Sequence, residues 1–160
     1  MSVLAWLVFL ALLGFFFNDQ LAQQFNPNRE LDTRYSEQGV REVVLQRNRL
    51  GHYVTSGEIN GEPVVFMLDT GATGVAIPAK IARRLGLRQG QAYRVETANG
   101  PSTAYATRLD SVSVGGIVRY DVEAGIAAGY QGDEILLGMS FLKHIDFSQR
   151  GDTLILRQAL

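Results

Sequence analysis

The sequence contains no cysteine, which excludes disulfide bonds, thiolate nucleophiles and cysteine-based metal sites. This absence suits a cytosolic or an exported protein equally well, so it does not identify the compartment. Histidine is also scarce, and the two histidines, His52 and His144, lie far apart in the sequence. Protein metal sites need three or four ligands, and neither histidine has a second ligand at metal-binding spacing. We therefore predict no metal site and no cofactor.

Clusters of like charge are missing as well. The net charge is -1, and acidic and basic residues are interspersed along the chain. A nucleic-acid-binding surface needs a clustered set of basic residues, so the sequence argues against a nucleic-acid partner. A length of 160 residues suits one domain with an appendage.

One long apolar run, Val3 to Phe17, stands apart from this mixed composition. A helix over residues 1–17 would be about 25 Å long, slightly shorter than a hydrocarbon core of about 30 Å. A cleaved signal peptide is the alternative, but no basic side chain precedes the run, and a cut after Ala22 would leave Gln20 at the -3 position. We predict an uncleaved transmembrane anchor over residues 1–17.

A polar stretch rich in Asn, Gln, Asp, Pro and Ser follows the apolar run. We predict that residues 18–40 form an extended tether and that residues 41–160 form the globular domain. The arginines after the run, Arg29, Arg34 and Arg41, would place the domain in the cytoplasm by the positive-inside rule. They begin well beyond Phe17 and are mixed with acidic residues, so charge alone gives little information on orientation.

The globular part has the pattern of an all-β fold. Asn60-Gly61 and Asn99-Gly100 are residue pairs typical of tight hairpin turns, because both residue types tolerate positive φ. Helical signals are brief: one helix is expected over 78–85, ended by Gly86, and another over 139–144. Many short strands with close turns predict a small closed barrel with one or two short helices. The expected strands are Glu42–Gln46, His52–Glu58, Pro63–Leu68, Tyr93–Ala98, Thr103–Leu109, Ser111–Val114 and Val118–Ala124, with Pro63–Leu68 buried on both faces.

The candidate chemistry lies at Asp69, which ends an apolar strand and begins the run Asp69-Thr70-Gly71-Ala72. Placing an ionised carboxylate there carries a desolvation cost. Asp followed by Thr-Gly is also ordinary turn chemistry after a strand, so the tripeptide alone does not identify a catalytic residue.

Its surroundings resemble the retroviral-type, or retropepsin-like, aspartic peptidases. The resemblance rests on the strand and loop of residues 65–72, on the apolar segment 135–137 followed by Gly138 and a short helix, and on an intervening hairpin over 95–105. It covers about residues 41–157 and is strongest to the bacterial membrane-anchored branch. That branch implies a single-pass protein of the bacterial inner membrane with a periplasmic peptidase domain. Two departures stand out: Met139 and Thr73 occupy positions where retroviral members carry Arg and Asp, which pair with each other.

One aspartate is too few for this chemistry. Peptide hydrolysis needs a base for the attacking water and an acid for the carbonyl oxygen, and two adjacent carboxylates that share one proton supply both. The chain contains a single Asp-Thr-Gly run, so the mechanism requires a second copy of the chain, in a two-fold homodimer.

The resemblance also implies roles for individual residues. Asp69, Thr70 and Gly71 form the catalytic set: Asp69 supplies the carboxylate, the Thr70 hydroxyl bonds across the two-fold axis, and Gly71 permits close approach of the substrate. Gly138 allows the helix to pack tightly behind the loop. An extended peptide segment of a protein substrate would contact Ala72 and the hairpin residues Thr97, Asn99 and Gly100.

The implied function is a membrane-tethered aspartic endopeptidase. A catalytically silent module of the same fold that binds peptides or partner proteins is the alternative, because fold does not fix activity. A third possibility is an unrelated β-barrel module in which Asp69 only caps a turn.

Overall fold

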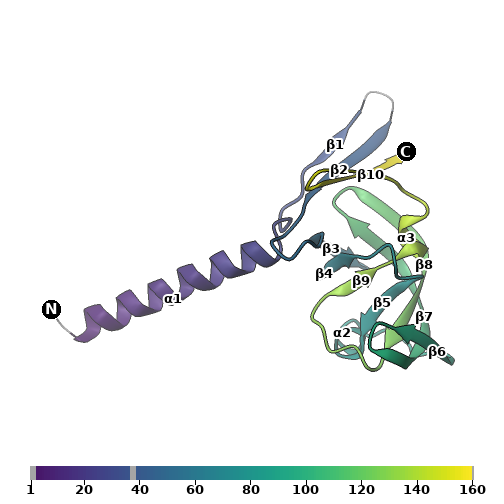
Figure 1. Ribbon diagram of the computed structural model, residues 1–160, viewed down its shortest axis with the longest axis horizontal. Helices are drawn as coiled ribbons and strands as arrows, with labels where there is room; N and C mark the ends of the chain where they lie inside the picture. Colours follow the sequence, from purple (N-terminus) through teal and green to yellow (C-terminus); the bar gives the residue numbers. More distant parts are fainter. Residues whose placement is uncertain (1–2, 37–38, 160) are drawn as a thin grey trace.

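The computed structural model describes residues 3–36 and 39–159. A long helix, α1 (Val3–Phe25), projects away from a body made mostly of strands (Figure 1). The body contains strands β1 (Thr33–Tyr35), β2 (Val40–Gln46), β3 (Val54–Ile59), β4 (Glu62–Leu68), β5 (Val75–Pro78), β6 (Ala92–Thr97), β7 (Gly100–Val114), β8 (Ile117–Ala127), β9 (Ile135–Leu137), β10 (Asp146–Arg150) and β11 (Thr153–Ala159), and the short helices α2 (Ala79–Arg84) and α3 (Met139–Leu142).

The strands form two sheets. Four strands pair in the order β1-β2-β11-β10, and seven pair in the order β3-β4-β9-β5-β8-β7-β6. A further β3–β7 pairing would close the larger sheet on itself, but it joins only Glu58 to Ser113 and Ile59 to Val112. The β5–β9 pairing is the single residue pair Ala76–Leu136. The all-β prediction with short helices is confirmed, but we describe two sheets rather than the expected closed barrel, because the closing contacts are this short.

Local sequence signals explain several elements. Asn60 and Gly61 have φ values of 53° and 80°, so both central residues of the β3–β4 turn lie in the left-handed region, as predicted. Gly86 has φ 64° and ends α2, where its N–H donates to the Arg83 carbonyl and the Leu87 N–H donates to the Ala82 carbonyl. These two bonds form the Schellman arrangement that satisfies the last carbonyls of a helix.

Two strand predictions need correction. Burial along β4 alternates: Val64 and Phe66 are buried, whereas Val65 and Met67 are partly exposed, so the strand is not buried on both faces. The expected strands 103–109 and 111–114 form one long strand, β7, whose register against β8 is the same before and after Asp110. Strands β1, β5, β9, β10 and β11 were not predicted, because each is short or lacks a clear alternation at its ends.

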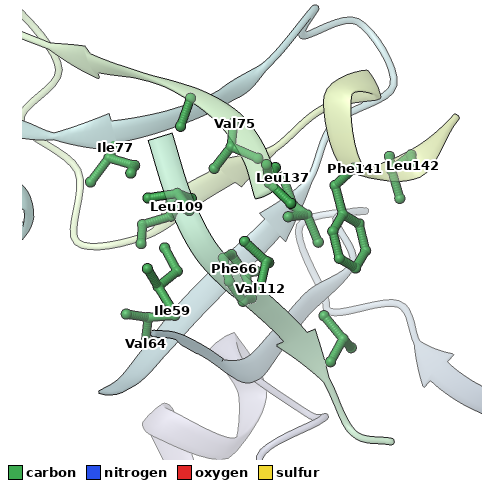
Figure 2. Close-up of a cluster of buried hydrophobic side chains, with 14 of the residues drawn as sticks. Ile59, Val64, Phe66, Val75, Ile77, Leu109, Val112, Leu137, Phe141 and Leu142 are labelled. Carbon is green, nitrogen blue, oxygen red and sulfur yellow. The ribbon is translucent and has the colours of Figure 1, made fainter. Parts of the chain in front are cut away.

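The hydrophobic core is formed by strands of the larger sheet together with α2 and α3, and β2 and β11 of the smaller sheet also contribute buried side chains to it. Figure 2 shows Phe66 of β4, Val112 of β7, Leu137 of β9 and Phe141 of α3 in one cluster. All four side chains are fully buried. Because β4, β9 and α3 all contribute, the core fixes the two chain segments that lead into and support the Asp69 loop.

The N-terminal segments differ from expectation. α1 continues through residues 18–25 to Phe25, and none of its residues is buried. Asn26 and Asn28 are buried, and β1 pairs with β2, so the described residues of the segment 18–40 do not form the expected extended tether. The reason is that side-chain amides in this polar stretch bond to the strands of the body. Among the described residues, α1 is the one helix long and apolar enough to span a membrane.

Candidate active site

Asp69 lies immediately after β4, at the point where β4 runs parallel to β9. Leu68 is the register partner of Leu137, and the Asp69 N–H donates to the Leu137 carbonyl at 3.2 Å. The side chain of Asp69 is partly buried. The parallel pair therefore places the carboxylate at the edge of the core without enclosing it.

The residues after Asp69 form a tight loop around its carboxylate. The Gly71 N–H donates to Asp69 Oδ1 at 2.8 Å, and the Ala72 N–H donates to the Asp69 carbonyl at 3.2 Å. Hydrogen bonds from N–H groups to an ionised carboxylate are among the stronger ones in proteins. The Gly71 N–H holds carboxylate oxygen Oδ1, and no residue in 3–36 or 39–159 donates a hydrogen bond to the other oxygen, Oδ2.

The start of α3 supports this loop from behind. The Met139 N–H donates to the Ala72 carbonyl at 2.9 Å, and the Ser140 N–H donates to the Thr73 carbonyl at 3.0 Å. Gly138, the residue before α3, has no room for a side chain: a Cβ there would lie 2.2 Å from the Gly74 carbonyl oxygen and 2.5 Å from that of Ala72. The predicted need for glycine at position 138 is confirmed by these distances.

The two positions that depart from the retroviral pattern are adjacent in space. Thr73 and Met139 belong to the loop and helix that these backbone hydrogen bonds join. The connection between loop and helix therefore exists here without an ion pair. Backbone N–H and carbonyl groups form this connection, and they are present whatever side chains occupy positions 73 and 139.

Ser140 is a further supporting residue, which we did not predict. Its hydroxyl donates to the Glu123 carbonyl at 2.9 Å and accepts a hydrogen bond from the Val75 N–H at 3.1 Å. It thereby connects α3 to β8 and to the start of β5. A lone serine two residues into a short helix gives no signal of this role in the sequence.

The hairpin of β6 and β7 has its turn one residue earlier than expected. Thr97 pairs with Gly100, so Ala98 and Asn99 are the two turn residues, and Gly100 has φ 98°. The Thr97 hydroxyl donates to the Gly100 carbonyl at 2.7 Å and accepts from the Asn99 N–H at 3.2 Å. Thr97 and Asn99 are exposed and Gly100 is partly buried.

The predicted site residues therefore fall into two groups. Asp69, Thr70, Gly71 and Ala72 share one loop, in which Thr70 is exposed. Thr97, Asn99 and Gly100 share the hairpin tip, and no hydrogen bond in the described part of the chain joins the tip to the loop. Within residues 3–36 and 39–159, no three His, Asp or Glu side chains are grouped closely enough to hold a metal ion.

Comparison with known proteins places this geometry in context. The family model described as gag-polyprotein putative aspartyl protease matches residues 55–144, which include the Asp69 loop, the hairpin and Gly138. The crystal structure of a retropepsin-like aspartic protease from Rickettsia conorii is similar to this chain with a TM-score of 0.64 and 32% identity, over 81% of this chain and 96% of that one.

Two curated sequences are also similar. An uncharacterized protein in the cobV 5′ region of a Sinorhizobium species is 36% identical over 145 residues, which is 88% of this chain and 62% of that protein. An uncharacterized protein of Rickettsia prowazekii (strain Madrid E) is 32% identical over 109 residues, 65% of this chain and 46% of that protein. The chain thus spans about half to two thirds of the length of these relatives.

Proposed function

Because the chain belongs to the retropepsin-like aspartic protease family, we propose that it is an aspartic endopeptidase that works as a homodimer. The observation that carries the proposal is the loop at Asp69. One oxygen of the carboxylate is held by the Gly71 N–H, and the loop is supported from behind by the Gly138 segment. This arrangement keeps a carboxylate in a fixed position at the end of a core strand, as a catalytic acid requires.

The proposed reaction uses the Asp69 carboxylates of two chains, one ionised and one protonated. The ionised carboxylate takes a proton from water, whose oxygen forms a bond to the peptide carbonyl carbon. The protonated carboxyl gives its proton to the carbonyl oxygen. The carboxyl that took the proton from water then gives it to the nitrogen as the C–N bond breaks, and a hydroxyl of the intermediate returns a proton to the other carboxylate, which leaves a new carboxyl group, a new amine and the starting pair.

Other residues have supporting roles in the proposal. The Thr70 hydroxyl is exposed on the loop, where it is accessible to a second copy and holds the pair of loops together. Gly71 and Ala72 border the scissile bond. Thr97, Asn99 and Gly100, at the tip of the β6–β7 hairpin, contact an extended peptide, whose main chain pairs with strand edges.

The apolar helix gives the proposed location. α1 is exposed along its length and apolar in its first part, so residues 1–17 anchor the chain in a membrane. We propose a single-pass protein of the bacterial inner membrane with its peptidase domain in the periplasm and with exposed segments of other envelope proteins as substrates. The competing proposal, a silent peptide-binding module, retains the fold but not the cleavage.

Replacing Asp69 separates these two proposals. We expect Asp69→Asn to lower cleavage of a proteome-derived peptide library by at least about a hundredfold, because the shared proton is lost. Asp110→Asn is the matched control, since Asp110 is exposed on β7, away from the loop. Cleaved peptides would be identified by mass spectrometry. Equal cleavage by both variants would exclude the mechanism.

The same variant tests the requirement for two chains. When Asp69→Asn protein is mixed with an equal amount of wild-type protein under exchanging conditions, activity per wild-type chain should fall by about half, because mixed dimers contain one functional carboxylate. Addition of Asp110→Asn protein should not lower the activity per wild-type chain. Activity that is unaffected by Asp69→Asn protein at any ratio would mean that single chains cleave.

A further inference from the structure

Strand β6 is an edge strand with little support from the body. It pairs with β7 alone, and the hairpin they form carries the tip residues of the proposed substrate site. Tyr93, Val95 and Thr97 alternate along β6 and therefore share one face of the hairpin. Side-chain contacts on that face must fix the angle of the hairpin relative to the sheet.

Tyr93 makes such a contact, across β7 and onto β8. Its register partner on β7 is Ala104, a small buried residue over which the ring passes. On β8 the ring reaches Gly125: a Cβ built on this glycine would lie 2.3 Å from the Tyr93 hydroxyl oxygen, 3.4 Å from the ring carbon that bears it and 3.6 Å from the Ala104 Cβ. The space above Gly125 is therefore filled by the end of the Tyr93 side chain.

Gly125 does not need to be glycine for its backbone conformation. Its φ is outside the left-handed region, and it lies in the interior of β8, paired with Ala76 of β5 and Ala106 of β7. Glycine in a strand interior weakens the strand and often marks a close approach by another group. The group that approaches here is the Tyr93 hydroxyl, so the glycine serves the contact with the hairpin.

We infer that Tyr93 seated on Gly125 is a positioning contact that sets the β6–β7 hairpin over the peptide-binding face. The inference rests on the proposed function, because the peptide is the ligand that the hairpin would hold. Tyr93 is 44% exposed and does not touch the Asp69 loop by any described hydrogen bond, so it acts through the hairpin and not on the reacting atoms.

Suppression by a second substitution provides the test. Gly125→Ala places a methyl group against the Tyr93 hydroxyl, so the ring must leave its position on β8 and the hairpin loses this contact. Tyr93→Phe removes the oxygen that lies at 2.3 Å and leaves the nearest ring carbon at 3.4 Å, an ordinary contact distance. In the full chain in detergent, we expect Gly125→Ala to raise KM for a cleaved library peptide by about tenfold, because a displaced hairpin weakens the binding of substrate and transition state alike.

The combined variant should restore the wild-type KM to within about threefold, and kcat should change little in any of the three proteins, because the contact affects binding and not the chemical step. A general loss of folded protein would instead lower the apparent kcat and leave KM unchanged. Gly90→Ala is the matched control: its methyl group would meet the Ala106 carbonyl oxygen at 2.7 Å, at the base of the same hairpin but away from Tyr93. Tyr93→Phe should not rescue this control.

Amide hydrogen exchange of residues 92–105 gives a readout that needs no activity. Exchange in this segment should be faster in Gly125→Ala and should return to the wild-type rate when Tyr93→Phe is added. A chain that cleaves no peptide but shows this pattern would refute the proposed function and support the contact. A chain that cleaves peptides but shows no suppression, in KM or in exchange, would overturn the inference.

Discussion

At the scale of single residues, the site depends as much on missing side chains as on the carboxylate. Gly138 is the clearest example, since Ala72 and Gly74 place their carbonyl oxygens in the space that a Cβ would occupy. The Met139 N–H reaches the Ala72 carbonyl only because the two segments approach this closely. The position of the Asp69 loop is thus set by a backbone contact that one added methyl group would disrupt.

We predict that Gly138→Ala destabilises the protein by about 1–3 kcal/mol, because overpacking against backbone atoms forces the helix and loop apart. Gly74→Ala is the control: its Cβ would meet nothing closer than the Ser140 hydroxyl oxygen, at 3.9 Å. That change should alter stability by no more than about 0.5 kcal/mol. Urea denaturation measures both values. Equal stability of the two variants would show that the close approach at Gly138 is not required.

The sequence predicts these residues unevenly. The loop at Asp69 and the glycine at 138 were predicted from their resemblance to a known family, because each lies in a short segment that such a resemblance can match. Ser140 does not, since its bonds to Val75 and Glu123 join three segments that are distant in the chain. The role of the Ser140 hydroxyl depends on contacts between segments that are distant in the chain, and a local sequence pattern does not reveal such contacts.

At the scale of elements, the connection between α1 and the body is firmer than composition suggests. The Asn28 Nδ2 donates to the Gln46 carbonyl at 2.9 Å and to the Val54 carbonyl at 2.7 Å, and its Oδ1 accepts from the Gln46 N–H at 2.7 Å. The Asn48 side chain donates to the Phe25 carbonyl at the end of α1. Asparagine amides thus join the helix end, the end of β2 and the start of β3.

We predict that Asn28→Ala destabilises the protein by about 1–3 kcal/mol, because the buried Val54 carbonyl and the part-buried carbonyl and N–H of Gln46 lose their partners. The side chain is 4% exposed, so water cannot replace it without opening the joint. Asn18→Ala, on the exposed surface of α1, is the control and should change stability by no more than about 0.5 kcal/mol. Thermal denaturation of the two full-length variants would compare them, and similar midpoints would contradict the prediction.

This joint also shows why the predicted tether was wrong. Residues 18–40 are polar, and polar composition without periodicity normally indicates solvated chain. An asparagine side chain, however, carries the same donor and acceptor as a peptide group and can take the place of a strand partner. The sequence therefore reveals the polarity of this segment but not its burial.

At the scale of the whole molecule, the proposed function gives α1 and the body separate roles: α1 holds the chain in a membrane, and the bodies of two copies pair. Copies held in one membrane have a raised effective concentration, so weak association between bodies suffices for a dimer. We predict that a chain without residues 1–17 is mostly monomeric and has activity per chain that rises with concentration. Activity assays over a dilution series and analytical sedimentation would test this.

An unrelated apolar helix in place of residues 1–17 is the control, and in liposomes it should restore activity at low protein concentration. A shortened chain that sediments as a tight dimer at low nanomolar concentration would contradict the prediction. Residues 18–25 are retained in both proteins, because Phe25 and Gln24 bond to the body.

The parallel pairing of β4 with β9 has a consequence for synthesis in the cell. The loop at Asp69 leaves the ribosome early, but the groups that shape it, from Leu137 to Ser140, are made much later. A growing chain therefore carries Asp69 before the backbone groups that hold its loop have been made. The loop can take its final shape only once translation has passed Ser140, so the order of the strands delays the folding of this region until late in synthesis.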